Sequence, residues 1–154
     1  CMERSSPPRD TAWAMSQENV EIVRTLFDTF ARRDHEAAFE YYDAEIEWDA
    51  SRGREWGDVD TAGVYHGHDG VRAYWRRWLS AWEDVEATEV EFVDAGQTVV
   101  ALIHRQRLRG RGSGIEVNAP PYALAFTLRN GKVVRWVLYP TQREALEAAG
   151  LSAE

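Results

Sequence analysis

Residues 63–82 read GVYHGHDGVRAYWRRWLSAW, and this stretch decides the fold. Its second half places apolar side chains at steps of three and four, which predicts a helix over residues 70–82 with one wide apolar face. The residues on that face are Val71, Tyr74, Trp75, Trp78, Leu79 and Trp82. His68 or Asp69 is placed to cap the first turn. A short helix so rich in tryptophan needs a broad, concave apolar partner, and the pattern predicts that Trp78 is a core residue.

Downstream of this helix the apolar period changes to the alternation that is typical of strands. Val90 and Phe92 alternate with acidic residues, and the Asn130-Gly131 pair favours a hairpin turn because both residues tolerate positive φ. The predicted strands span residues 98–109, 115–129 with a bend and bulge near Pro120-Pro121, and 132–139, followed by a helix over 141–149.

Upstream, the pattern begins with helices and ends with a strand. Helices are predicted over residues 16–33 and 35–42, a strand over 45–50, a long polar loop over 51–62 and a short strand over 64–66. Ser16 and Asp34 are suitable N-caps for the two helices. Helices lead and an antiparallel sheet follows, so we expect an α+β fold in which a strongly curved sheet packs on helices.

The length of 154 residues fits one domain. Residues 1–15 are polar and without a period, and they are interpreted as a tail or vector remnant, with Met15 as the expected first native residue. The single domain is then expected over residues 16–151. Both faces of residues 99–103 are apolar, which predicts a homodimer through the outer face of the sheet.

Composition excludes several classes of function. The net charge of −8 argues against nucleic-acid binding and against docking on an anionic membrane surface, since both need a basic footprint. No apolar run is long enough for a membrane span, and the first residues lack the apolar core of a secretory signal. Cys1 is the only cysteine, so neither an intrachain disulfide nor a cysteine-based metal site is expected. A cytoplasmic location is predicted.

Four stretches carry a resemblance to a known family. They are Glu45–Trp48 (EIEW), Gly63–Val71 (GVYHGHDGV), Phe126–Val134 (FTLRNGKVV) and Arg143–Leu151 (REALEAAGL). Residues 16–151 resemble the SnoaL-like branch of the nuclear transport factor 2-like, ketosteroid-isomerase-like superfamily. The resemblance implies a cone-shaped, curved antiparallel sheet wrapped around helices, a cystatin-like α+β barrel with a pocket at its open end, and a dimer. Family members include isomerases, polyketide cyclases, epoxide hydrolases and non-catalytic binding domains, so the fold does not determine the function.

The catalytic set of the ketosteroid isomerases is not retained in this sequence. An ungapped match places Leu26 where that branch has its tyrosine and Ala50 where it has its aspartate base, with Asp49 one position away. Its second acid falls near Tyr122 or Ala123.

The set of the limonene-type epoxide hydrolases is not retained either. Arg105 matches the arginine, but Arg107 and Leu138 stand where the two carboxylates would be. A cyclase-type activity would need an acid or base in the pocket, and the resemblance assigns none.

Three residues are candidates for catalysis: Asp49, His66 and Arg105. Asp49 ends the first strand and could serve as a general base, or it could face solvent, since alternation places it opposite Trp48. His66 and His68 form an H-x-H pair, but no third ligand is evident, so a pocket-edge histidine is favoured over a metal site. No metal or cofactor is expected.

The alternating arginines allow two arrangements. If Arg105 and Arg107 point inward, they could hold a carboxylate or enolate oxygen of a ligand. If they point outward, they could pair across the sheet with Glu89, Glu91 and Glu116.

An aromatic and aliphatic pocket is predicted, and plain core packing is the alternative for part of the set. Its expected lining residues are Trp48, Trp56, Tyr65, Trp75, Tyr122, Leu124, Phe126, Trp136 and Leu138. The favoured function is a cofactor-free acid/base enzyme of isomerase, cyclase or hydrolase type that acts on a small apolar, oxygenated molecule. The alternative is a non-catalytic binding or dimerisation domain of the same fold.

Overall fold

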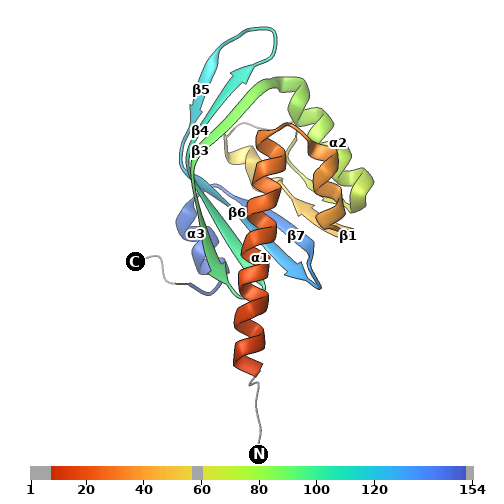
Figure 1. Cartoon of the computed structure of the whole chain (residues 1–154). Coiled ribbons are helices and arrows are strands. Elements are labelled where there is room, and N and C mark those ends of the chain that lie inside the picture. The colour runs from red at the N-terminus through yellow and green to blue at the C-terminus, as the bar shows by residue number, and fades with distance from the viewer. Residues whose placement is uncertain (1–7, 57–60, 152–154) are drawn as a thin grey trace, which may run out of the picture.

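The computed structural model describes residues 8–56 and 61–151 (Figure 1). The helices are α1 (Pro8–Ala31), α2 (Gly67–Ala81) and α3 (Gln142–Ala148), and two 3-10 helices are η1 (His35–Tyr41) and η2 (Ser51–Trp56). The strands are β1 (Tyr42–Asp49), β2 (Val64–His66), β3 (Trp82–Ala95), β4 (Thr98–Gly110), β5 (Glu116–Ala119), β6 (Tyr122–Arg129) and β7 (Lys132–Tyr139). The predicted α+β class is confirmed.

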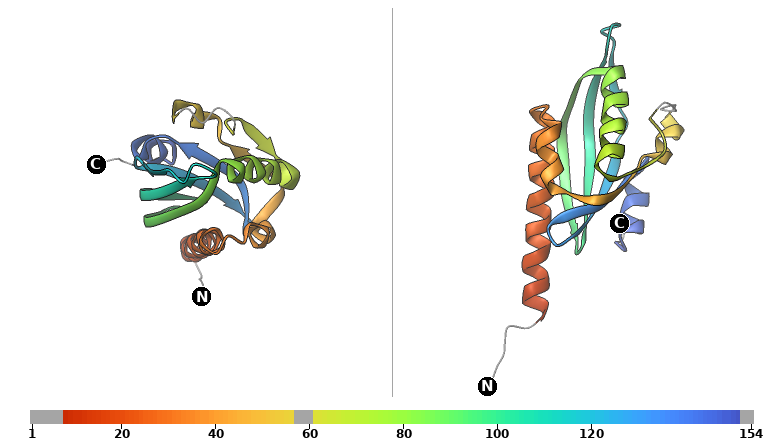
Figure 2. Two further views of the ribbon diagram at one scale, coloured as in Figure 1. Left: turned by 90° about the horizontal axis from the view of Figure 1, so that it is seen from above. Right: turned by 90° about the vertical axis from the view of Figure 1, so that its right-hand side faces the viewer.

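The seven strands form one curved, open sheet in the order β2-β1-β7-β6-β4-β3, with β5 on β4. Neighbouring strands are antiparallel, except that β1 and β7 run parallel. Figure 2 shows α1 and α2 on one side of the sheet, while α3 lies on the other. The β4–β5 hairpin extends beyond the helices (Figure 1).

A bend in the β3–β4 ribbon has a register shift as its local cause. Val90 pairs with Ile103, but the next pair is Glu89 with Arg105, so His104 is an extra residue on β4. A second shift leaves Thr88 as an extra residue on β3. Bulges of this kind bend a strand and reverse which residues face inward. Beyond the bulge, the buried residues of β4 are therefore Gln106 and Leu108.

The tryptophan-rich helix α2 forms where it is predicted, but it begins at Gly67 rather than Gly70. The expected capping role of His68 or Asp69 is not seen: His66 occupies the N-cap without a side-chain hydrogen bond. The His68 ring instead places Nε2 3.0 Å from the Tyr42 carbonyl oxygen. This contact joins the first turn of α2 to the start of β1.

Three further element predictions need correction. Helix α1 begins at Pro8 rather than Ser16, and Ser51–Trp56 forms the 3-10 helix η2 within the predicted loop. The predicted strand over 115–129 is two strands that break at Pro120-Pro121, and both pair with β4. Proline has no N–H for the ladder, so two in succession end a strand instead of bending it.

Helix α3 covers the outer face of the sheet. Ala145 packs with Val100, Leu102 and Ala123 in a second apolar cluster, on the opposite face from Val99 and the main core. The apolar outer face that motivates the predicted homodimer is thus partly covered within one chain. The homodimer itself stays a prediction.

Candidate functional site

A cavity of about 1550 Å³ lies between helices α1 and α2 and the concave side of the sheet. Strands β3, β4, β6 and β7 form its floor, and residues of β5 line part of its mouth. Small-molecule pockets usually measure roughly 300–1,000 Å³. The cavity is therefore large enough for a polycyclic molecule.

One wall of the cavity is aromatic and comes from the end of α2. Trp75 and Trp78 meet edge to face with ring centroids 5.7 Å apart, and Trp82 lies 6.5 Å from Trp78. All three line the cavity and are half-buried, so they cover a hollow instead of filling the core. The apolar stripe of α2 is divided: Val71 and Tyr74 are buried, while Trp75 and Trp78 are half-buried and line the cavity.

The floor opposite this wall is apolar. It includes Ile103 and Leu108 from β4, Leu124 from β6, and Trp136 from β7. The Trp136 ring is stacked on Trp48 behind it, with ring planes 6° apart and centroids 4.1 Å apart. This stack holds Trp136 flat and gives the floor a rigid aromatic surface.

Two polar side chains interrupt the floor. The Tyr122 hydroxyl donates a hydrogen bond to Oε1 of Gln106, and both side chains are buried. Burial raises the pKa of the Tyr122 phenol, and the bond to Gln106 opposes that rise only in part, so the phenol stays protonated. The Oε1 atom of Gln106 already accepts the hydrogen bond from Tyr122. The Nε2 group of the same amide can donate a hydrogen bond to a ligand oxygen. Gln106 lies inside because of the bulge at His104.

His35 is the histidine of the cavity wall. Its ring is stacked on Phe30 at 5.9 Å and contacts Trp75 at 4.6 Å between centroids. Burial lowers the pKa of His35 below its usual 6.5, and the negative charge of Asp34 opposes that shift. The imidazole is therefore neutral at neutral pH and can accept a proton.

Two arginines at the cavity rim are paired with carboxylates of the rim. Arg33 bonds to Asp84, and Arg107 bonds to Glu86. The Arg111 guanidinium donates to the Leu79 carbonyl oxygen at 2.9 Å, which anchors the β4–β5 hairpin to the end of α2. These pairings leave the rim without a concentrated positive charge that would select an anion.

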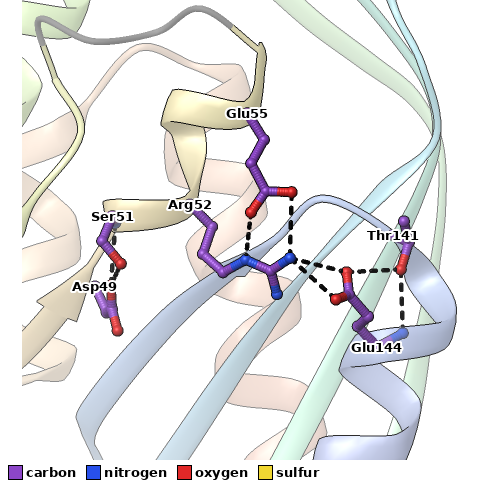
Figure 3. Close-up of polar contacts among 6 residues, drawn as sticks. All are labelled: Asp49, Ser51, Arg52, Glu55, Thr141 and Glu144. Atoms are coloured by element: carbon purple, nitrogen blue, oxygen red, sulfur yellow. Dashed lines mark hydrogen bonds and ion pairs between the residues drawn. The ribbon is translucent and has the colours of Figure 1, made fainter.

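The three catalytic candidates from the sequence lie outside the cavity. Arg105 is 74% exposed and pairs with Glu89, because the bulge turns it outward. His66 is exposed at the start of α2. Asp49 is on the opposite side of β1 from Trp48, and its Oδ1 accepts from the Ser51 hydroxyl at 2.6 Å (Figure 3). The outward alternative is therefore observed for Arg105, whereas Arg107 lies at the cavity rim and pairs with Glu86.

Figure 3 also shows an ion-pair network beside Asp49. Arg52 of η2 bonds to Glu55 at 2.6 Å and to Glu144 of α3 at 3.0 Å. Hydrogen bonds from Arg52 and, with a smaller effect, from Thr141 lower the pKa of Glu144. The network is solvent-exposed and joins η2 to α3, so its role is to hold these surface elements together.

The predicted pocket lining is divided between cavity and core. Trp75, Tyr122, Leu124, Trp136 and Leu138 line the cavity. Trp48 and Phe126 are fully buried behind its floor. Tyr65 does not line the cavity, and its hydroxyl donates to the Thr61 carbonyl oxygen at 2.8 Å. The side chain of Trp56 lies outside the described residues.

Sequence reasoning missed His35 and Gln106 as cavity residues. His35 directly follows the helix cap Asp34 and resembles a polar residue of a helix start. Gln106 lies between two arginines, and strict alternation from Ile103 would place it outside. Across the described residues, no cluster of three or more His, Cys, Asp or Glu side chains could hold a metal ion. None of the helices described has the length and apolar character of a membrane span.

A family model for the SnoaL-like domain matches residues 23–136. The chain therefore belongs to the SnoaL-like domain family. No curated protein matches it.

Solved structures show the same nuclear transport factor 2-like fold. A nuclear transport factor 2-like protein of unknown function from Burkholderia pseudomallei is 22% identical, with a TM-score of 0.69 over 84% of this chain and 95% of that one. One from Burkholderia xenovorans is 25% identical, with a TM-score of 0.66 over 80% and 88%. A candidate polyketide cyclase from Xanthomonas campestris is 15% identical, with a TM-score of 0.63 over 86% and 97%.

Proposed function

We propose that the protein binds a small, flat, neutral and oxygenated apolar molecule in the cavity between α2 and the sheet. The observation that carries this proposal is the arrangement of Trp75, Trp78 and Trp82 opposite an apolar floor that contains the Gln106 amide. Aromatic faces bind planar apolar rings, and a few polar groups orient such ligands.

The polar group of the ligand is a carbonyl oxygen. Tyr122 occupies the oxygen of the Gln106 amide, so the free part of this side chain is a donor. A hydrogen bond received by the amide oxygen polarises the amide and strengthens the donor. Because Arg33 and Arg107 are already paired with carboxylates, a neutral carbonyl suits the site better than a carboxylate.

Acid/base catalysis on the bound molecule is a second candidate function, and the position of His35 favours it. A neutral imidazole in an apolar wall is a suitable general base, which fits a cofactor-free enzyme of isomerase, cyclase or hydrolase type. Two solved neighbours support a ligand-binding role for this fold. One is TerC, co-crystallised with polyporic acid, and the other is the candidate polyketide cyclase.

Fluorenone and fluorene test the binding proposal, since both are flat and they differ by one carbonyl group. Calorimetry should show that both bind and that fluorenone binds more tightly. Gln106→Leu should weaken fluorenone binding roughly threefold to tenfold, the equivalent of one neutral hydrogen bond, and leave fluorene unchanged. Arg105→Ala is the matched control on the outer face and should change neither. No binding of either compound would refute the proposal.

A further inference from the structure

We infer that His35 accepts a hydrogen bond from a ligand hydroxyl group, so that the cavity selects hydroxylated aromatic molecules. The inference rests on the proposed function, because it assigns a second polar contact to the same bound ligand. On the sheet side, Gln106 would donate a hydrogen bond to a carbonyl oxygen of the ligand. On the helix side, His35 would accept one from a hydroxyl group of the ligand.

Local structure fixes His35 in the cavity wall. Asp34 is the N-cap of η1, and its Oδ1 accepts from the Ala37 N–H at 3.3 Å, which makes His35 the first residue of that helix. The imidazole then lies between Phe30 of α1 and Trp75 of α2. These two rings pack against the imidazole ring. Neither of them offers an oxygen atom that could form a hydrogen bond with the imidazole nitrogens.

The hydrogen-bonding state of His35 sets it apart from other histidines. Its Nδ1 is buried without a hydrogen-bond partner among the described residues. By contrast, His68 Nε2 lies 3.0 Å from the Tyr42 carbonyl oxygen, and His104 contacts both Glu91 and Gln142. Buried polar groups in native proteins are normally paired, and an exception calls for an explanation such as a missing ligand.

The charges around His35 suit a proton acceptor. Phe30 and Trp75 are uncharged, Asp34 is the acidic neighbour, and Arg33 is held by Asp84. Asp28 is a further acidic residue of the cavity lining on α1. Burial favours the neutral imidazole, while Asp34 supports the imidazolium once it forms. A cation beside the Trp75 ring gains additional stabilisation from the aromatic face.

The contact with the ligand is a hydrogen bond and not a proton transfer. As a phenolic ligand binds, its O–H group donates a hydrogen bond to an imidazole nitrogen. The proton stays on the ligand oxygen, because a phenol ionises near about pH 10 and burial lowers the pKa of His35 below 6.5. No covalent bond is formed or broken, so no oxidant, reductant or second reactant is required.

Hydroxyfluorene and methoxyfluorene test the inference, because methylation removes the donated proton and keeps the ring system. In calorimetry at about pH 7.5, wild type should prefer hydroxyfluorene by roughly threefold to tenfold, the size of one hydrogen bond. His35→Phe keeps an aromatic ring between Phe30 and Trp75 and should lose that preference. His35→Gln, which can still accept a hydrogen bond, should retain part of it.

Acidification gives a second readout on the unmodified protein. As the pH falls from about 7.5 to values below the lowered pKa of His35, the preference for hydroxyfluorene should fall in wild type, because protonated His35 cannot accept a hydrogen bond. Phenols stay protonated over this range, since they ionise near about pH 10. His35→Phe should show no such change. Equal affinity for the two compounds in wild type, or a preference that survives both His35→Phe and acid, would overturn the inference. Failure of methoxyfluorene to bind at all would instead count against the proposed function.

Discussion

Arg105 pairs with Glu89 on the outer face of the sheet, with Nε 2.9 Å from Oε1. The two residues stand opposite each other at the bulge where His104 is the extra residue of β4. That extra residue turns Arg105 away from the cavity and places Gln106 inside it. The polar chemistry of the cavity therefore depends on an irregularity in one strand.

Arg105→Ala should leave ligand binding unchanged and lower the free energy of unfolding by less than about 1 kcal/mol, the usual limit for an exposed ion pair. Calorimetry with fluorenone and a denaturant melt check the two statements. A clear loss of affinity in this variant, with Gln106→Leu unaffected, would mean that Arg105 reaches the ligand.

Trp48→Ala and Trp78→Ala should differ sharply in stability. Trp48 is fully buried under the floor, and its removal should cost about 3–5 kcal/mol of unfolding free energy. Trp78 is half-buried in the cavity wall, so the same change should cost only about 1–2 kcal/mol, reflecting partial burial. Fluorenone affinity should fall in Trp78→Ala. Equal destabilisation in urea melts would show that Trp78 is a core residue after all, as the sequence predicts.

Stability should fall on mild acidification because of His35. Its pKa is lower in the folded state than the ordinary 6.5, so the unfolded chain binds this proton first. The contribution is fully present above pH 6.5 and is lost as the pH falls towards the folded value. Urea melts of wild type and His35→Phe across this range measure the difference. The stability of wild type relative to His35→Phe should fall as the pH drops below 6.5. A constant difference at every pH would contradict the expectation.

Ala145→Asp should release α3 from the sheet. Ala145 is fully buried against Val100 and Leu102, and an unpaired charge there cannot be accommodated. The exposed outer face should then promote association, which sedimentation velocity would detect as species larger than those of wild type. Ala148→Asp is the milder comparison, because Ala148 is exposed at the last residue of the helix. Unchanged sedimentation in Ala145→Asp would show that α3 does not shield this surface.

The sequence predicts most elements because their signals are local. Asn130 and Gly131 adopt positive φ in the expected hairpin, and the helix expected over 141–149 forms as α3 with Thr141 as its N-cap. The stripe of α2 likewise predicts the side that faces the sheet. Its spacing does not reveal that Val71 fills the core while Trp78 lines a hollow, since that depends on how far the sheet curves away.

The site was less predictable, and the reason is again the bulge. Strict alternation from Ile103 places Arg105 inside and Gln106 outside, and one extra residue reverses both. The sequence around His104 contains no glycine or proline that would mark the irregularity. His35 was missed for a different reason: its neighbour Trp75 comes from a distant part of the chain.

A crystal structure of the complex with fluorenone tests the central claim most directly. The account predicts that the ring system lies between the Trp75–Trp78–Trp82 wall and the apolar floor, with its carbonyl oxygen within hydrogen-bonding distance of Gln106 Nε2. Fluorenone bound elsewhere on the protein, or bound in the cavity with its carbonyl turned away from Gln106, would contradict the account.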